Sequence, residues 1–168
     1  MSLLENCRKV FQTVYAQTKI CPVITQHHLS DSVDDICKTA GQPVLQTEIS
    51  IRSVDENHIL QTGEIGEICT RGPRVKTKYN DKPAAASEVI DTEGWLHTGD
   101  FGTVKARGFF PVTSRVKEMI IRDGEKHFPA ETKNCLLEHS YLGEIAVDAL
   151  PDPKWGEVIG AFIAALGF

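Results

Sequence analysis

The sequence lacks a long apolar segment, a run of basic residues and a paired cysteine motif, and each absence excludes a class of protein. No stretch reaches the roughly 20 apolar residues that a membrane-spanning helix needs. The formal net charge is −5, so no basic surface for nucleic acid is expected. The N-terminus has neither the basic start nor the apolar core of a secretory signal. These absences predict a cytoplasmic protein with no transmembrane segment and no nucleic-acid partner.

Cysteine and histidine are also too dispersed to suggest a framework of disulfides or metal ions. The five cysteines are Cys7, Cys21, Cys37, Cys69 and Cys135. Their number is odd and none forms a C-x-x-C pair, so we expect free thiols in a reducing compartment. The adjacent pair His27-His28 would point to opposite faces of a strand, which argues against joint metal binding.

The first forty residues show helical and then irregular patterns. Hydrophobic residues make up 41% of the chain and charged residues 24%, which is ordinary for a globular domain. Apolar side chains recur at helical spacing over residues 3–11. Residues 26–38 are polar and predict a loop with room for one helical turn.

From Gly41 onward the pattern changes to short strands separated by glycine. Residues 47–51 and 63–71 alternate polar and apolar side chains, which indicates half-buried strands. Their spacing predicts an antiparallel sheet or a small barrel. A short helix is expected over residues 83–90, because Pro83 can open it and three alanines favour it.

The last third predicts an α+β arrangement. Residues 119–121 form a short apolar strand, and Pro129 opens a helix with Glu131 in its first turn. An apolar stripe on that helix would consist of Ala130, Cys135, Leu136 and Leu137. Strands are expected over residues 145–150 and 158–166, separated by a turn at Pro151-Asp152-Pro153.

The most specific motif is Gly94-Trp95-Leu96-His97-Thr98-Gly99-Asp100-Phe101-Gly102. Thr-Gly-Asp alone is a common turn sequence, but here it stands in an ordered series of motifs. Upstream lie Tyr15-Ala16-Gln17-Thr18 and Gly66-Glu67-Ile68-x-x-Arg71-Gly72. Downstream lie Gly108-Phe109, Arg115-x-Lys117-Glu118, Gly124, Phe128-Pro129-Ala130-Glu131 and Pro151-Asp152-Pro153-Lys154-Trp155-Gly156-Glu157.

This series resembles the superfamily of acyl-CoA synthetases, luciferases and peptide-synthetase adenylation domains, over most of residues 10–165. The resemblance implies that Asp100 accepts both ribose hydroxyls of ATP, a task suited to an acceptor-only carboxylate. It implies that Arg115 also reaches the nucleotide, that Thr18 lies beside the α-phosphate and that Tyr15 packs against adenine. The alternatives are a turn-capping Asp100, a surface salt bridge for Arg115 and a core position for Tyr15.

Two further roles follow from the resemblance. Lys117 stands at the hinge about which the family's small C-terminal domain rotates between its two half-reactions. Gly124 corresponds to the glycine beside the pantetheine tunnel of CoA, where a missing side chain allows close approach. The alternative for Gly124 is an ordinary turn glycine in Asp123-Gly124.

The chain also departs from the family pattern. The Ser/Thr/Gly-rich phosphate loop is absent, and the adenylation lysine would lie beyond residue 168. Lys19 replaces the glutamate that helps to hold Mg²⁺, and an ammonium group cannot ligate a cation. Ala16 replaces a glycine, and Lys78 replaces the glycine before Tyr79. We therefore expect no complete catalytic set, no metal site and no activity of the isolated chain.

The fold class expected is mixed α+β, in three parts. Residues 1–40 would form the edge of a large αβ subdomain, residues 41–113 a β-barrel-like subdomain and residues 114–168 the start of a C-terminal α+β domain. The function expected is that of a fragment of an ATP-dependent carboxylate–CoA ligase, with ATP, Mg²⁺ and CoA as cofactors. A non-catalytic nucleotide- or partner-binding homologue and a luciferase-like oxygenase stay open. Open strand edges would favour self-association.

Overall fold

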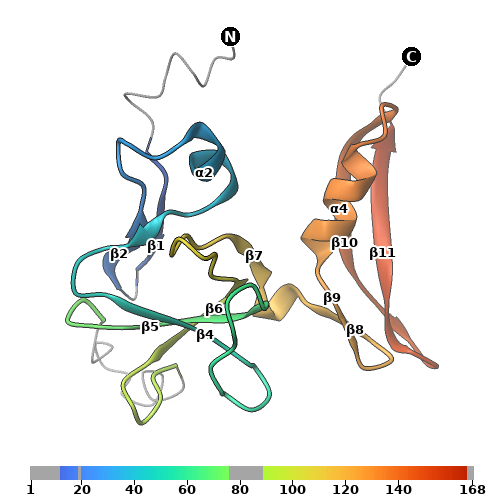
Figure 1. The fold of residues 1–168 in the computed structure, drawn as a ribbon. Helices are drawn as coiled ribbons and strands as arrows, with labels where there is room; N and C mark the ends of the chain where they lie inside the picture. Colours follow the sequence, from blue (N-terminus) through green and yellow to red (C-terminus); the bar gives the residue numbers. More distant parts are fainter. Residues whose placement is uncertain (1–11, 19, 76–88, 166–168) are drawn as a thin grey trace. The chain divides into compact units, whose positions relative to one another are not determined.

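The computed structural model describes residues 12–18, 20–75 and 89–165, which fall into two compact units (Figure 1). The first unit is Met1–Val112 and the second is Thr113–Phe168. In the part of the chain so described, no helix is long and apolar enough to cross a lipid bilayer. The expected helix over residues 3–11, all but the last two residues of the one over 83–90, and Lys19 lie outside the described residues.

A small antiparallel sheet begins the first unit. Its strands, in spatial order, are β1 (Val14–Gln17), β2 (Ile20–Gln26) and β3 (Gln42–Pro43). Ile20 and Ile24 of β2 are fully buried and cluster with Leu96. Burial of each such side chain contributes about 1.5–3 kcal/mol, so this cluster holds β2 and, through pairing, β1.

The polar segment after β2 contains helix α2 (Val33–Lys38), which is longer than the single turn expected. The Ser32 hydroxyl caps it by accepting the Asp35 backbone N–H at 3.1 Å. Asp34 and Asp35 lie in the first turn, where the helix dipole favours negative charge. Ile36 is the helix's buried residue, and one apolar position is too weak a periodic signal to predict it.

A second antiparallel sheet forms the body of the first unit. It contains β4 (Glu48–Arg52), β5 (Gly66–Arg71) and β6 (Leu96–Gly102). Ile51 and Ile68 stand opposite each other and pack with Phe110. The strands predicted from alternation over residues 47–51 and 63–71 are therefore confirmed.

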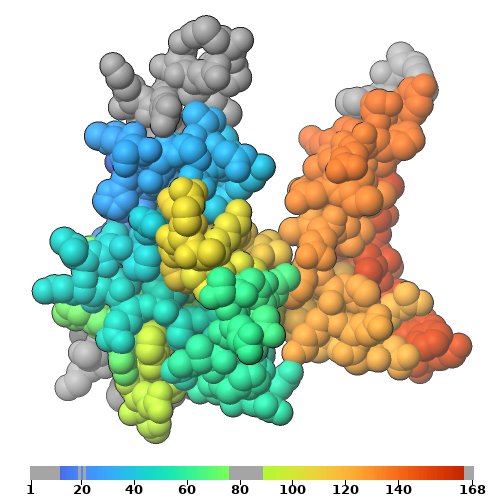
Figure 2. Space-filling view, viewed as in Figure 1, coloured from blue at the N-terminus to red at the C-terminus, as the bar shows by residue number. Residues whose placement is uncertain are grey.

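The described strands of the first unit make open sheets, so the barrel-like description is not supported by the described residues. The loop between β4 and β5 lies on the surface, green in Figure 2, where Ile59 is 65% exposed. Strand β7 (Val112–Arg115) runs across the division between the units. The three-part division expected from sequence stays a prediction.

In its described residues, up to residue 165, the second unit is a four-stranded antiparallel sheet with one α-helix. Its elements are η1 (Val116–Glu118), β8 (Ile120–Arg122), β9 (Glu125–His127), α4 (Pro129–Leu137), β10 (Leu142–Asp152) and β11 (Gly156–Ala165). Strand order is β10-β11-β8-β9. The α+β character expected for this region agrees with these elements.

Two details of this unit differ from the sequence-based expectation. The β10 strand continues through Pro151 and Asp152, so the turn lies over residues 153–155, where the Asp152 carboxylate accepts the backbone N–H groups of Lys154 and Trp155, each at 2.8 Å. Helix α4 begins at Pro129 as predicted, but none of its residues is buried in the structure. Its apolar stripe therefore does not form part of a core among the described residues.

Candidate nucleotide site around Asp100

The backbone that carries Asp100 is a bulge in β6. Glu67 of β5 pairs with Phe101 of β6, and Cys69 pairs with His97. Between these two pairs, β5 has the single residue Ile68, whereas β6 has residues 98–100. Gly99 has a φ of 78°, which favours glycine. Bulges re-aim side chains at functional sites, and this one directs Asp100 out of the regular ladder.

Three hydrogen bonds fix the bulge. The Thr98 hydroxyl donates to the Ile68 carbonyl at 2.7 Å and accepts the Asp100 N–H at 3.2 Å. The Gly99 N–H donates to the Glu67 carboxylate at 2.9 Å. Both Thr98 and Asp100 are buried, at 7% and 8% exposure. The position of Asp100 is therefore set by the sheet, which suits a binding group that must be preorganised.

The Asp100 carboxylate receives two donors from β1. The Tyr15 hydroxyl donates to Oδ2 at 2.6 Å, and the Gln17 amide donates to the same oxygen at 2.8 Å. Burial, followed by the hydrogen bond to Asp100, raises the pKa of Tyr15 well above its usual value, so its phenol stays protonated and able to donate. The structure thus brings Tyr15 and Asp100 together across 85 positions of sequence.

Gln17 is a residue of this site that the sequence analysis missed. Its amide also donates to the Thr98 carbonyl at 3.0 Å, so it joins the carboxylate to the backbone of the bulge. The signal was present, because alternate residues of a strand share a face and Tyr15 and Gln17 are two apart. Thr18 follows in the turn after β1 and is exposed.

The remaining predicted residues belong to the second unit. Arg115 ends β7 and is exposed, Lys117 lies exposed in η1, and Gly124 follows Asp123 in the two-residue turn between β8 and β9. Asp123 and Gly124 have φ values of 50° and 81°, as a tight hairpin turn requires. The turn alone explains this glycine. The roles of Arg115 at the nucleotide, Lys117 at the hinge and Gly124 at CoA stay predictions.

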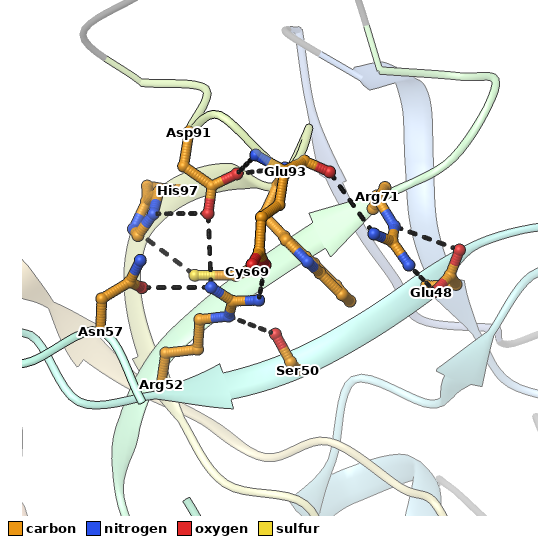
Figure 3. Close-up of polar contacts among 10 residues, drawn as sticks. Glu48, Ser50, Arg52, Asn57, Cys69, Arg71, Asp91, Glu93 and His97 are labelled. Atoms are coloured by element: carbon orange, nitrogen blue, oxygen red, sulfur yellow. Dashed lines mark hydrogen bonds and ion pairs between the residues drawn. The ribbon is translucent and has the colours of Figure 1, made fainter. Parts of the chain in front are cut away.

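A second polar cluster fixes the start of β6 (Figure 3). The buried Arg52 guanidinium contacts Asp91 at 3.3 Å and Glu93 at 3.5 Å, and it lies 4.8 Å from the ring centre of Trp95. Arg71 lies 4.6 Å from the same ring. Cation–π contacts of this kind stabilise a desolvated indole, so the Gly94-Trp95 end of the motif serves to position the strand.

Comparison with known proteins identifies the family to which this chain is similar. Residues 2–80 match the model of the AMP-binding enzyme family. The chain is 35% identical over 167 residues to 2-succinylbenzoate–CoA ligase of Bacillus subtilis, covering 97% of this chain and 33% of that protein. It is 36% identical over 147 residues to feruloyl-CoA synthase of Amycolatopsis, covering 86% of this chain and 29% of that protein.

A solved structure agrees with these relatives. The o-succinylbenzoate CoA synthetase of Bacillus subtilis, in complex with its acyl-adenylate intermediate, superposes with a TM-score of 0.81 at 33% identity, covering 98% of this chain and 34% of that one. This chain thus spans about a third or less of the relatives that it matches. It belongs to the AMP-binding, adenylate-forming ligase superfamily that includes the acyl-CoA synthetases.

Proposed function

We propose that this chain supplies the ribose-binding part of the nucleotide site in an ATP-dependent ligase that joins a carboxylic acid to CoA. The observation that carries the proposal is the Asp100 carboxylate, held on a strand bulge by Tyr15 and Gln17. A carboxylate accepts hydrogen bonds and donates none, which matches the vicinal hydroxyls of a ribose. Family membership supports the same assignment.

The reaction that we propose for the whole enzyme has two steps. The substrate carboxylate attacks the α-phosphorus of ATP, so that an acyl–phosphate bond forms and pyrophosphate leaves. The CoA thiol then attacks the acyl carbon, a thioester forms, AMP leaves with the bonding electrons and the thiol proton passes to solvent. Asp100 would bind and orient the nucleotide in both steps. It suits this role because the sheet fixes its position before any ligand arrives.

The other residues would act around this anchor. Tyr15 would lie against the adenine ring through its aromatic face while its hydroxyl holds Asp100. The exposed Thr18 hydroxyl would approach the α-phosphate. In the second unit, Arg115 would reach the nucleotide with its donor fork, Lys117 would serve as the hinge and Gly124 would lie near CoA.

A resident Mg²⁺ does not fit the donor set described around Asp100. Mg²⁺ requires a near-octahedral shell of oxygen ligands, including carboxylates. Here the Tyr15 hydroxyl and the Gln17 amide nitrogen both point their hydrogens at Asp100 Oδ2, so neither neighbour supplies an oxygen ligand beside the carboxylate. These residues are therefore not proposed as ligands of a metal ion.

Titration with AMP tests the proposal directly. We expect calorimetry to show one AMP site on the chain, and Asp100→Asn to weaken it about 10- to 100-fold, since hydrogen bonds to a charged group contribute about 1.5–3 kcal/mol. Asp148→Asn is the matched control, because Asp148 is exposed on β10 of the second unit. Equal AMP affinity in the wild type and Asp100→Asn would remove the proposed role.

The alternative function is a non-catalytic homologue that only binds nucleotide, and Lys19 in place of the family's glutamate favours it. Both functions predict AMP binding, so pyrophosphate exchange by the full-length protein separates them. A ligase exchanges labelled pyrophosphate into ATP when an acid substrate is present. A non-catalytic homologue does not exchange it. In that case, recovery of exchange in Lys19→Glu would show that this position alone had removed the activity.

A further inference from the structure

Three side chains on the faces of β5 and β6 bring a carboxylate, a thiol and an imidazole together outside the Asp100 site. Glu67 and Cys69 are two residues apart on β5, and His97 is the direct cross-strand partner of Cys69. Nδ1 of His97 lies 2.7 Å from the Glu67 carboxylate and 3.5 Å from Cys69 Sγ. One ligand atom from each residue lies within 4.8 Å of the other two.

The sulfur–nitrogen distance matches that of a tetrahedral zinc centre, and the carboxylate oxygen must shift to fit one. With Zn–S near 2.3 Å and Zn–N near 2.0 Å, a tetrahedral angle separates sulfur and nitrogen by about 3.5 Å; Cys69 Sγ and His97 Nδ1 are 3.5 Å apart. The Glu67 oxygen would move from 2.7 Å to about 3.3 Å from the same nitrogen, a change that a side-chain rotation supplies. The geometry points to a Zn²⁺ site formed by Glu67, Cys69 and His97, with water as the fourth ligand.

The groups around the three ligands would orient them. Zinc-bound histidines commonly present their second nitrogen to a carboxylate. His97 Nε2 lies 3.9 Å from Asp91 Oδ2, and Figure 3 marks this contact with a dashed line. The second oxygen of Glu67 accepts the Gly99 N–H at 2.9 Å. Glu67 and His97 are therefore already partly oriented by neighbouring groups, which lowers the cost of binding an ion.

The surrounding charge also suits a dication. Glu67, Asp91 and Glu93 contribute −3 and Arg52 contributes +1, so the cluster carries −2 before any ion arrives. Cys69 and Glu67 are 0% and 8% exposed, which limits competition by water. On binding, Zn²⁺ replaces the thiol proton of Cys69, a Zn–S bond forms and the proton passes to solvent.

The proposed ion would stabilise the pairing of two strands, and its water position would stay open. It would join β5 to β6 beside the bulge that carries Asp100, because Glu67 would contact both the ion and the Gly99 N–H. All three ligands lie in the first unit, so the metal site does not require the second unit, and Glu67 connects it to the bulge that carries Asp100. Its presence or absence does not decide the proposed ligase function.

Cobalt provides a spectroscopic test, because Co²⁺ accepts the same ligands and a Co–thiolate bond absorbs in the near ultraviolet. We expect the chain to bind one Co²⁺, to release it to Zn²⁺ and to unfold at a higher temperature with Zn²⁺. Cys69→Ser should abolish the thiolate band. Cys37→Ser, at an exposed position on α2, should leave it unchanged and is the matched control.

Two more variants keep the test decisive if Cys69→Ser does not fold. His97→Gln should also remove the site, and Asp91→Asn should weaken Co²⁺ affinity about 10- to 100-fold, because it changes the partner of His97 and leaves the ligands in place. Absence of the band in the wild type, its persistence in a folded Cys69→Ser or His97→Gln, or equal loss in Cys37→Ser would overturn the proposal.

Discussion

The Tyr15–Asp100 hydrogen bond is the contact on which the candidate site depends most, and it can be removed alone. Tyr15→Phe deletes the 2.6 Å bond and keeps the ring. Because the acceptor is a carboxylate and Gln17 remains, we expect the free energy of unfolding to fall by about 1–2 kcal/mol in urea denaturation. Tyr141→Phe, at a position that is 59% exposed, should change it by less than about 0.5 kcal/mol. Equal losses in the two variants would contradict this account.

The same residue predicts how stability depends on pH. Burial and Asp100 raise the pKa of Tyr15 in the folded chain, so the unfolded chain releases this proton first as pH increases. The stabilisation is complete below pH about 10, the usual tyrosine value, and is lost above it. Between pH 9.5 and 11.5 the wild type should lose up to about 1.4 kcal/mol per pH unit more than Tyr15→Phe. Parallel pH profiles for the two proteins would show that Tyr15 is not responsible.

The sequence predicted the site residues that stand in a recognisable motif. It did not predict those whose role depends on how the chain folds. Asp100 and Tyr15 stood in motifs, and the structure joins them by a hydrogen bond. Gln17 was missed because its importance depends on the β6 bulge, which brings Thr98 and Asp100 within reach of β1. The Glu67–Cys69–His97 cluster was missed for a similar reason, because strand register decides which side chains face each other.

At the scale of elements, one glycine controls how β2, β3 and the segment before β7 come together. Gly41 has a φ of 91°, and a Cβ there would overlap the backbone of Gln26. Its carbonyl accepts the Phe110 N–H at 3.1 Å. Gly41→Ala must therefore both adopt an unfavourable backbone conformation and displace β2.

Gly63→Ala is the matched comparison, because Gly63 has a φ of 94° and no atom within 4 Å of the added Cβ. Conformational strain alone costs about 1–3 kcal/mol. We expect the midpoint of thermal unfolding to fall in both variants and to fall clearly further in Gly41→Ala. A drop in Gly41→Ala no larger than that of Gly63→Ala would mean that β2 can move aside.

Elements with a strong local signal were predicted correctly, and the errors have physical causes. Alternation identified β4 and β5, and Pro129 with Glu131 identified the start of α4. The turn between β10 and β11 was predicted too early in the sequence. Pro151 stays in β10, where it pairs with Glu157 of β11. Barrel closure could not be predicted, since it depends on strand tilt and not on the spacing of glycines.

At the scale of the whole molecule, the proposed nucleotide anchor lies in one unit and its predicted partner in the other. Tyr15, Gln17, Thr98 and Asp100 belong to Met1–Val112, whereas Arg115 belongs to Thr113–Phe168. A ligand that contacted Asp100 and Arg115 together would couple the two units. Binding of AMP is therefore the measurement that can report on their cooperation.

A double-mutant cycle makes this coupling measurable. If the Asp100 carboxylate and the Arg115 guanidinium act on one nucleotide, Asp100→Asn and Arg115→Ala should each weaken AMP binding, and the double variant should deviate from additivity by about 0.5–3 kcal/mol. Arg122→Ala is the control, since the Arg122 guanidinium lies 5.5 Å from the Trp155 ring within the second unit and should leave affinity unchanged. Strict additivity of Asp100→Asn and Arg115→Ala would separate Arg115 from the ribose site. Asp100 and its donors from β1 would then act as the anchor without Arg115, because the contacts of Asp100 with Tyr15 and Gln17 lie within the first unit.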